Sequence, residues 1–582
     1  CGGISNAFPL GAVPRRHERR IKVKVLFIGD VGSISEFHVG DEAMLEAALY
    51  EVGVRTALDA VVVSSDPEET ARRYAVASIP RVPVPEATSE YLKRLELILA
   101  TAKGSVGLLA SDDTAWGLID AVAGSNGVVI AGGGNLSSTF RVQLHERHLV
   151  AMLAKVFSKP LVVTGQTLGP VLDADGGELL AEIGQAASIF GCRESASTDI
   201  ARALGVDEQH LAHTVDDASF LGTQDPADSL GSAELIPTGY AIATFSDYPG
   251  TASSELWAQA CAALVDQVID ETGLDVVLVP HVGDLTQTAE RGDVAFHGHV
   301  KSLCRSQTNV RLAALMSPRQ VIEVTTYASL VVSSRYHQVV FGLAAGVPSI
   351  GVAVDEYTHH KLSGALANFG LQQFALPSVA VVSGHAETVV REVWRNRDDI
   401  RAHLTGVGQI HRRNSSTWWE CVAQVLTGEL SGVPETAAIE PLDLLSSQSH
   451  GHLEQMSHFM IESARRESDF RMQMRHRSEE VDLTKAELTE LRCLLAEQKA
   501  SHEALESELI DASVALRNSQ LLAAELASPI YRAMDRKTPS EQLIESVARR
   551  AKKSPTLRKS KTVRVAYSKA RSISVFQDSA KR

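Results

Sequence analysis

The first half of the chain alternates short apolar runs with longer segments of helical periodicity. Val and Ile dominate the apolar runs, which occupy 23–29, 60–63, 127–131 and 160–164. Between them, residues 41–52 and 144–157 repeat apolar positions at helical spacing. Because strands that alternate with helices pair in parallel, we expect a Rossmann-like domain over residues 21–230.

A second series of the same kind follows a loop at 222–237. Its apolar runs lie at 240–243, 275–279, 310–312, 330–332 and 349–352, and its helical segments at 255–272, 318–326 and 338–345. This series predicts a second doubly wound domain over residues 231–430. The expected fold class is therefore α/β, with two Rossmann-like domains that face each other across a cleft.

The pattern changes beyond Trp418 and Trp419, which we expect to pack in the core or between the domains. Residues 431–451 are rich in Ser, Gly, Pro and Glu and predict a linker. From 452 to 527 apolar residues repeat every seven positions, among them Val481, Leu488, Leu495, Leu509 and Leu516. This repeat favours a coiled coil that makes the protein a homo-oligomer, because a free helix would expose its apolar stripe to water. The alternative is a solitary helix that folds back on the body.

The two ends of the chain differ in composition from the rest. Residues 1–20 are rich in Gly, Pro and Arg and predict a disordered N-terminus. Residues 528–582 read as a basic, poorly ordered tail, which is most simply a solvated run of charge. Contact of this tail with the headgroups of an anionic membrane, or with an acidic polymer, is the functional alternative.

Composition limits the class of protein. With 582 residues the chain exceeds one hydrophobic core, and its 44% apolar content supports true burial. The net charge of −15 argues against nucleic acid as a partner, because duplex binding usually needs a basic footprint.

The cysteines and the apolar stretches bear on the compartment. Six cysteines are scattered without metal-ligand or redox spacing, which favours a reducing environment. No apolar stretch is long enough to span a bilayer, and residues 1–20 hold no hydrophobic signal region. We therefore expect a cytoplasmic protein, with peripheral contact at the inner face of the membrane as an alternative.

The strongest candidate for chemistry is the sequence Ser-Arg-Tyr-His at 334–337. It closes the apolar run 329–333, which places Arg335 and His337 at the carboxyl end of a strand, where open α/β sheets collect their ligands. Arg335 can grip a carboxylate or phosphate with two hydrogen bonds, and His337 has a resting pKa suited to proton transfer. The alternative interpretation is a helix N-terminus whose Arg and His are merely solvated or capped.

A glycine-rich segment follows the run 128–130. The backbone N–H groups of Gly132, Gly133, Gly134 and Asn135 could approach a ligand closely, and the next helix would favour an anion. A tight turn without a ligand is the alternative. The spacing is neither the dinucleotide fingerprint nor a P-loop. A second glycine-bearing loop at 165–170 is expected at the same edge of the sheet.

Several polar residues follow other apolar runs. Arg193 could extend a second guanidinium toward that edge, with an ion pair to Glu194 as the alternative. For a further set, helix capping or surface polarity competes with a catalytic role; it comprises Asp216, Asp217, His281 and Asp284.

Together these residues resemble the polysaccharide pyruvyl transferase family over residues 22–428. The matching pieces are Val-Gly-Asp-Glu-Ala at 39–43, the glycines at 132–134, Gly-Gln-Thr-Leu-Gly-Pro at 165–170, Arg-Glu-Ser at 193–195, Asp-Asp-Ala-Ser-Phe at 216–220, and Ser-Arg-Tyr-His at 334–337 before Gly-Val-Pro at 346–348. The chain departs from the family pattern at Glu194, where Asp is usual, at Asp217, where Pro is common, and in the spacing from Asp355 to Lys361.

The resemblance implies two domains arranged as in B-type glycosyltransferases, and transfer of pyruvate from phosphoenolpyruvate to a sugar as a ketal. It implies that Arg193, Arg335 and His337 surround phosphoenolpyruvate, with His337 and Arg335 catalytic. His281 and Lys361 join the glycine segment as further donor-binding candidates. Phosphoenolpyruvate is then a substrate, a saccharide is the acceptor, and neither a cofactor nor a metal is expected.

Two other functions stay open from the sequence. A nucleotide-sugar-dependent glycosyltransferase of the B-type fold would use the same pair of facing domains and the same glycine-rich segment. An inactive scaffold for envelope polysaccharide assembly would use the coiled coil and the basic tail to recruit partners.

Overall fold

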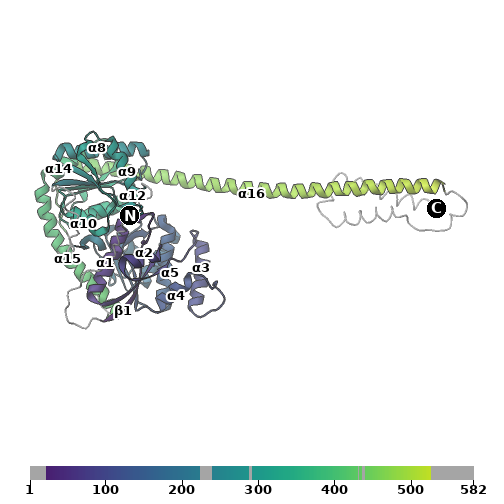
Figure 1. Ribbon diagram of the computed structural model, residues 1–582, viewed down its shortest axis with the longest axis horizontal. Coiled ribbons are helices and arrows are strands. Elements are labelled where there is room, and N and C mark those ends of the chain that lie inside the picture. The colour runs from purple at the N-terminus through teal and green to yellow at the C-terminus, as the bar shows by residue number, and fades with distance from the viewer. Residues whose placement is uncertain (1–20, 223–238, 287–290, 430–431, 435–438, 526–582) are drawn as a thin grey trace, which may run out of the picture. The chain divides into compact units, whose positions relative to one another are not determined.

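The computed structural model describes residues 21–222, 239–286, 291–429, 432–434 and 439–525. The expected disordered N-terminus, most of the loop at 222–237 and the basic tail lie outside these residues. The chain divides into two compact units, 1–468 and 469–582. The first unit holds two α/β lobes, here called the N-lobe and the C-lobe (Figure 1).

The N-lobe is built on a parallel sheet, as predicted. Its strands run in the order β4-β3-β1-β5-β7-β8-β9, and β6 pairs with β7 beside this path. The order reverses between β1 and β5, which is the switch point of a doubly wound sheet. The strands are β1 (Lys22–Ile28), β3 (Ala57–Ser64), β4 (Ala77–Pro80), β5 (Gly127–Ile130), β6 (Gly133–Leu136), β7 (Leu161–Leu168), β8 (Ile189–Cys192) and β9 (Leu211–His213).

Alternating side chains of β1 fill two different cores. Leu26 and Ile28 join one core, whereas Val25 and Phe27 join the other. Because both faces of the sheet are covered, its strands read as apolar runs rather than as an alternation. The helices of the lobe are α1 (Val39–Arg55), α2 (Pro67–Tyr74), α3 (Thr88–Ala102), α4 (Ala115–Ala123), α5 (Arg141–Val156), α6 (Ala174–Ala186) and α7 (Ser195–Ala203).

The C-lobe repeats the plan with six parallel strands in the order β13-β11-β10-β14-β15-β16. Its switch point lies between β10 and β14. The strands are β10 (Tyr240–Thr244), β11 (Asp275–Leu278), β13 (Val310–Leu312), β14 (Leu330–Ser333), β15 (Ser349–Ala353) and β16 (Ala375–Pro377). The helices are α8 (Ser254–Thr272), α9 (Asp293–Leu303), α10 (Pro318–Thr326), α11 (Tyr336–Ala344), α12 (Glu356–Asn368), α13 (Ser378–Val382) and α14 (Ala386–Arg395).

A short strand ladder and a long helix, both among the described residues, link the lobes. The short strands β2 (Phe37–His38) and β12 (Val282–Gly283) pair in an antiparallel ladder, one from each lobe. Helix α15 (Arg397–Thr427) runs along both lobes (Figure 1). Its first half contributes Ile400 and Leu404 to the C-lobe core, and its second half contributes Trp418 and Trp419 to the outer core of the N-lobe. The packing role expected for the two tryptophans is confirmed.

The described part of the segment expected to be a linker packs against the C-lobe. Leu442 N–H donates to the carbonyl of Gly370 (2.9 Å), and Gln373 accepts from the N–H groups of Leu444 and Leu445. The helix that follows, α16 (Ser447–Glu525), begins inside this segment, and its residues Leu453 and Met460 are buried in the C-lobe core.

The helical structure expected over most of 452–527 is confirmed as far as Glu525, while association of two copies stays a prediction. Within the described ranges, none of the helices combines the length and the apolar character needed to cross a bilayer. The described cysteines carry free thiols.

Candidate active site

The carboxyl ends of the two sheets border one cleft of about 550 Å³. The side chains that line it come from both lobes and include four of the residues selected from the sequence for positive charge or proton transfer, Arg193, Arg335, His337 and Lys361. In the C-lobe the cleft lies where β14 ends, beside the switch point of the sheet, as expected for a ligand site in an open α/β fold.

Arg335 is held in a fixed orientation by a buried carboxylate. It occupies the N-cap position of α11, and its Nε donates to both oxygens of Asp293, at 3.2 and 3.0 Å. The same carboxylate accepts from the N–H groups of His281 and Val282, at 3.0 Å each. Burial would raise the pKa of Asp293, but Arg335 and these hydrogen bonds lower it below its usual value. The Arg335 side chain keeps 24% of its surface exposed, so part of the guanidinium is open to the cleft.

His337 crosses from the C-lobe to residues of the N-lobe. Its Nε2 is buried without a hydrogen-bond partner and lies 3.6 Å from Oδ2 of Asp216. The other side of the ring rests on Gly40 at the start of α1, where a Cβ would come within 1.8 Å of Nδ1. Gly40 is therefore required for the imidazole to reach this position. Nε2 thus faces Asp216, and His337 lines the cleft.

Only 1% of the surface of Arg193 is exposed. Its Nη1 donates to Asp216 (2.6 Å), its Nε donates to Thr167 (2.8 Å) and Glu194 (3.2 Å), and its guanidinium stacks on the ring of Tyr336 at 4.3 Å. Burial opposes the charge, but the neighbouring acidic groups outweigh it and raise the pKa of Arg193. Arg193 therefore forms the ion pair with Glu194 that the sequence offered as the alternative, and it also lines the cleft.

The pKa values of the adjacent carboxyls Asp216 and Asp217 shift in opposite directions. Burial raises the pKa of both, but His337 and Arg193 overcome it at Asp216 and lower its pKa to about 2. At Asp217, burial raises the pKa to about 7 despite a hydrogen bond from Thr164 and the charge of Arg193. Asp216 also caps the short helix that follows by accepting from Ala218 N–H (2.9 Å), so the capping role and the charged role occur together.

His281 and Lys361 both line the cleft. Nε2 of His281 lies 2.9 Å from Oε1 of Gln338, and burial lowers the pKa of His281 to about 3, so the imidazole is neutral and buried rather than a surface group. Nζ of Lys361 lies 4.0 Å from the ring centre of Tyr357. Burial, assisted by Arg193, lowers the pKa of Lys361 to about 8, although Asp355 and Asp41 oppose the shift.

The glycine-rich segment reaches the cleft only in part. Gly134 and Asn135 line it, but the N–H of Gly132 donates to Asp217 (3.2 Å), and Gly133 lies in β6, which pairs with β7. The structure therefore does not present all of these backbone amides to a ligand. A Cβ on Gly132 would approach Asp217 to 2.7 Å, so this glycine makes room for a buried carboxyl.

The structure corrects the predicted loop at 165–170 and shows that Asp284, for which a polar role competed with catalysis, lies outside the cleft. Residues 165–168 continue β7 as buried strand instead of forming a loop. Asp284 closes a local turn by accepting from Thr286 N–H (2.8 Å), and it is not among the cleft residues.

Sequence reasoning did not select several residues of the cleft wall, among them Asp30, Asp41, Phe140, Tyr336 and Tyr357. Asp30 lies two residues after the end of β1, so the strand-end rule used for Arg335 could have found it. Tyr357 donates from α12 to the carbonyl of Gly134 (2.8 Å) in the other lobe, a contact across 223 positions that no local pattern announces.

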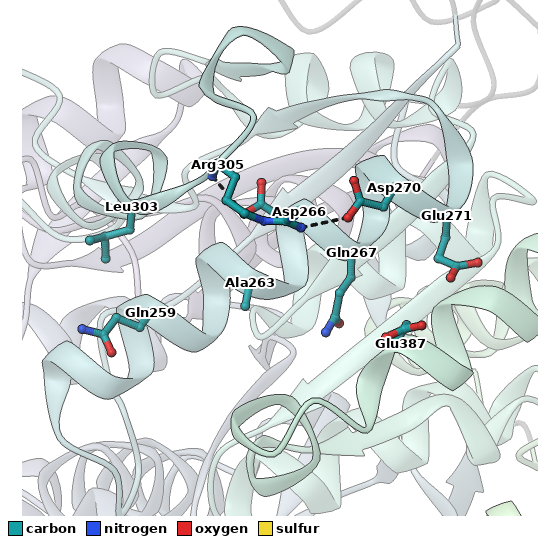
Figure 2. Close-up of a pocket in the computed structure, with 9 residues that line it drawn as sticks. All are labelled: Gln259, Ala263, Asp266, Gln267, Asp270, Glu271, Leu303, Arg305 and Glu387. Carbon is teal, nitrogen blue, oxygen red and sulfur yellow. Dashed lines mark hydrogen bonds and ion pairs between the residues drawn. The ribbon is translucent and has the colours of Figure 1, made fainter.

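A second hollow, of about 510 Å³, lies on the outer side of α8 and shares no residue with the cleft (Figure 2). Its carboxylates already have partners. Asp266 accepts from the backbone of Arg305 (2.9 Å), and the Arg305 side chain reaches Asp270 (2.8 Å), as the dashed lines in Figure 2 indicate. In the described part of the chain, no group of three or more His, Cys, Asp or Glu side chains is arranged to hold a metal ion.

Comparisons with solved structures find alignments at low identity. One is the UDP-GlcNAc 2-epimerase of Neisseria meningitidis bound to UDP-GlcNAc, with 9% identity over 70% of this chain and 100% of that one, at a TM-score of 0.44. Others are a putative UDP-N-acetylglucosamine 2-epimerase of Listeria monocytogenes, with 10% identity over 72% and 100% at 0.45, and Anabaena HepE in complex with UDP and glucose, with 11% over 70% and 100% at 0.42. No substrate of this chain follows from them.

The comparison with family models is more informative. No curated protein matches the sequence at a significant level. The model of the polysaccharide pyruvyl transferases matches residues 38–356, which is more than half of the chain and includes the segments that supply Arg193, Arg335 and His337. The chain therefore belongs to the polysaccharide pyruvyl transferase family.

Proposed function

We propose that this protein transfers pyruvate from phosphoenolpyruvate to a sugar of a cell-surface polysaccharide or glycan, where it forms a ketal and releases phosphate. The observation that carries the proposal is that Arg193, Arg335 and His337, drawn from two lobes, line a single cleft. Family membership supports the same reaction class.

The donor carries a carboxylate and a phosphate, so its site needs several fixed positive groups. Arg335 offers a planar guanidinium that Asp293 already orients, which suits a two-pronged contact with either group. Nη2 of Arg193 adds charge from the N-lobe, and Lys361 adds charge from α12 of the C-lobe. The amides at the N-terminus of α1 also favour an anion near Gly40.

His337 is the proposed proton donor. An Nε2–H would point at Asp216, whose carboxylate is ionised because its pKa lies near 2. This contact orients the ring, and we assign to Nδ1–H the proton transfer to the methylene carbon of the donor. Asp216 thus acts through His337 as a positioning residue.

The reaction then follows in two additions. Protonation of the methylene carbon builds oxocarbenium character at the neighbouring carbon, and one hydroxyl of the sugar adds there. A second hydroxyl of the same sugar then displaces phosphate and closes the ketal.

The test is to incubate the purified protein with phosphoenolpyruvate and saccharide fractions of the cell envelope, and to measure phosphate release and the added pyruvate ketal by mass spectrometry. His337→Ala should reduce turnover by about 10²–10⁴-fold, which is the usual contribution of a positioned proton donor. His299→Ala, on the exposed side of α9, is the matched control and should keep wild-type turnover. Near-normal turnover by His337→Ala would refute its role.

Thermal shift separates the proposal from a nucleotide-sugar glycosyltransferase. A donor that binds only the folded protein raises its melting temperature by mass action. Phosphoenolpyruvate should raise it, and a panel of nucleotide sugars should not. The reverse result would favour the glycosyltransferase, and a response to neither would favour an inactive scaffold.

A further inference from the structure

Asp41 borders the cleft from the N-lobe, whereas His337 borders it from the C-lobe. Asp41 lies in the first turn of α1. The residue before it, Gly40, carries the His337 ring against its backbone. The carboxylate and the imidazole therefore border the same space from two lobes.

Asp41 is partly open to solvent and lies close to a histidine. Its side chain keeps 27% of its surface exposed, and its carboxylate lies 3.6 Å from Nδ1 of His38. His38 is 45% exposed, so it offers a route for a proton from Asp41 to solvent. Across the cleft the charge of Asp41 acts on Lys361 and Tyr357, both on α12.

Two other carboxylates near the cleft are already paired. Asp30 accepts from Asn135 (2.6 Å) and pairs with Arg81, and Asp216 pairs with Arg193 (2.6 Å). An acidic side chain in a first turn can also simply stabilise its helix. That role requires neither a place on the cleft wall nor a cation on the facing lobe, and Asp41 has both.

We propose that Asp41 is the general base that takes the proton from the first acceptor hydroxyl. This inference rests on the proposed function. His337 gives its proton to the methylene carbon of phosphoenolpyruvate, and the electrons of the double bond form the new C–H bond. As the hydroxyl oxygen bonds to the adjacent carbon, its O–H electrons stay on oxygen and its proton passes to Asp41.

The second hydroxyl of the sugar completes the reaction. The oxygen of the second hydroxyl forms the other C–O bond, the bond from carbon to the phosphate oxygen breaks, and phosphate leaves with the electron pair and the proton of that hydroxyl. Asp41 releases its proton through His38 to solvent, and His337 is reprotonated from solvent. No oxidant, reductant or further reactant is needed.

The experiment uses the full 582-residue chain with phosphoenolpyruvate and the envelope saccharide fraction that supports wild-type phosphate release. Asp41→Asn keeps the size of the side chain and removes the base, so kcat should fall by about 10²–10⁴-fold. The rise in melting temperature produced by phosphoenolpyruvate should stay as in the wild type. In Asp41→Ala, added formate should restore part of the lost turnover, which a merely structural role would not allow.

Asp175→Asn is the matched control, because it removes an exposed first-turn carboxylate from α6, away from the cleft. It should keep wild-type kcat. If the wild type is active and Asp41→Asn turns over as fast as Asp175→Asn, or if formate does nothing for an inactive Asp41→Ala, the inference is wrong while the proposed function stands. A wild type that releases no phosphate with any saccharide fraction would overturn both.

Discussion

Each lobe places an arginine beside an aspartate at the carboxyl end of its sheet, but the two pairs differ in exposure. In the N-lobe, the Arg193 and Asp216 side chains are 2% and 1% exposed. In the C-lobe, Asp293 is fully buried while Arg335 keeps 24% of its side chain open. The same pair of residue types therefore occurs in two settings: Arg193 is buried and stacks on Tyr336 of the other lobe, whereas part of the Arg335 guanidinium is open to the cleft.

The largest effect is expected from removing Arg193. Arg193→Ala leaves Asp216 and Glu194 buried without their cation, and losing one member of a buried pair typically costs about 3–5 kcal/mol. We expect a loss of this size in the free energy of unfolding, measured by urea denaturation. Arg202→Ala, at the exposed end of α7, is the control and should unfold like the wild type. Unchanged stability in Arg193→Ala would remove the distinction between the two pairs.

Arg335→Lys should sharpen the comparison by affecting the donor more than the fold. A lysine keeps a positive charge near Asp293 but cannot reproduce a two-pronged contact. Losing one hydrogen bond to a charged group costs about 1.5–3 kcal/mol, so KM for phosphoenolpyruvate should rise by about ten- to a hundredfold. Steady-state kinetics measures KM, and urea denaturation should give nearly wild-type stability. A variant that unfolds as readily as Arg193→Ala would show that Arg335 stabilises the fold as much as Arg193 does.

The strand-end rule predicted the most informative part of the site. β14 could be located from the run at 330–332, and its position fixed Arg335 and His337 at the cleft. The same rule was less successful for the glycines, because Gly132 accommodates Asp217 from 85 positions away and Gly40 accommodates His337. A missing Cβ in a sequence does not reveal whether a ligand or a distant side chain fills the space. The alternation of strands and helices, by contrast, is a local property, and it predicted both parallel sheets.

The smallest expected effect concerns how Asp216 and Asp217 make stability depend on pH. The folded state raises the pKa of Asp217 from 3.8 to about 7, so its contribution to stability is present at low pH and is lost as the pH rises from about 4 to about 7. Asp216 has the opposite sign, because its lowered pKa stabilises the fold above about pH 4 and this is lost as the pH falls toward 2.

Asp217→Asn should therefore flatten the fall in unfolding free energy between pH 4 and pH 7 relative to the wild type, as measured by urea denaturation at a series of pH values. Identical slopes for the two proteins would mean that Asp217 ionises as an ordinary carboxyl.

The path of α15 also has a consequence for biosynthesis. The outer face of the first sheet, around Val25 and Phe27, is completed by Trp418, Trp419 and Val422, which leave the ribosome almost 400 residues later. While the C-lobe is being translated, that apolar face lacks its covering helix and is open to chaperones or to wrong partners. The N-lobe becomes mature only when the last turns of α15 arrive, so a fragment ending before them should not be expected to behave as an independent domain.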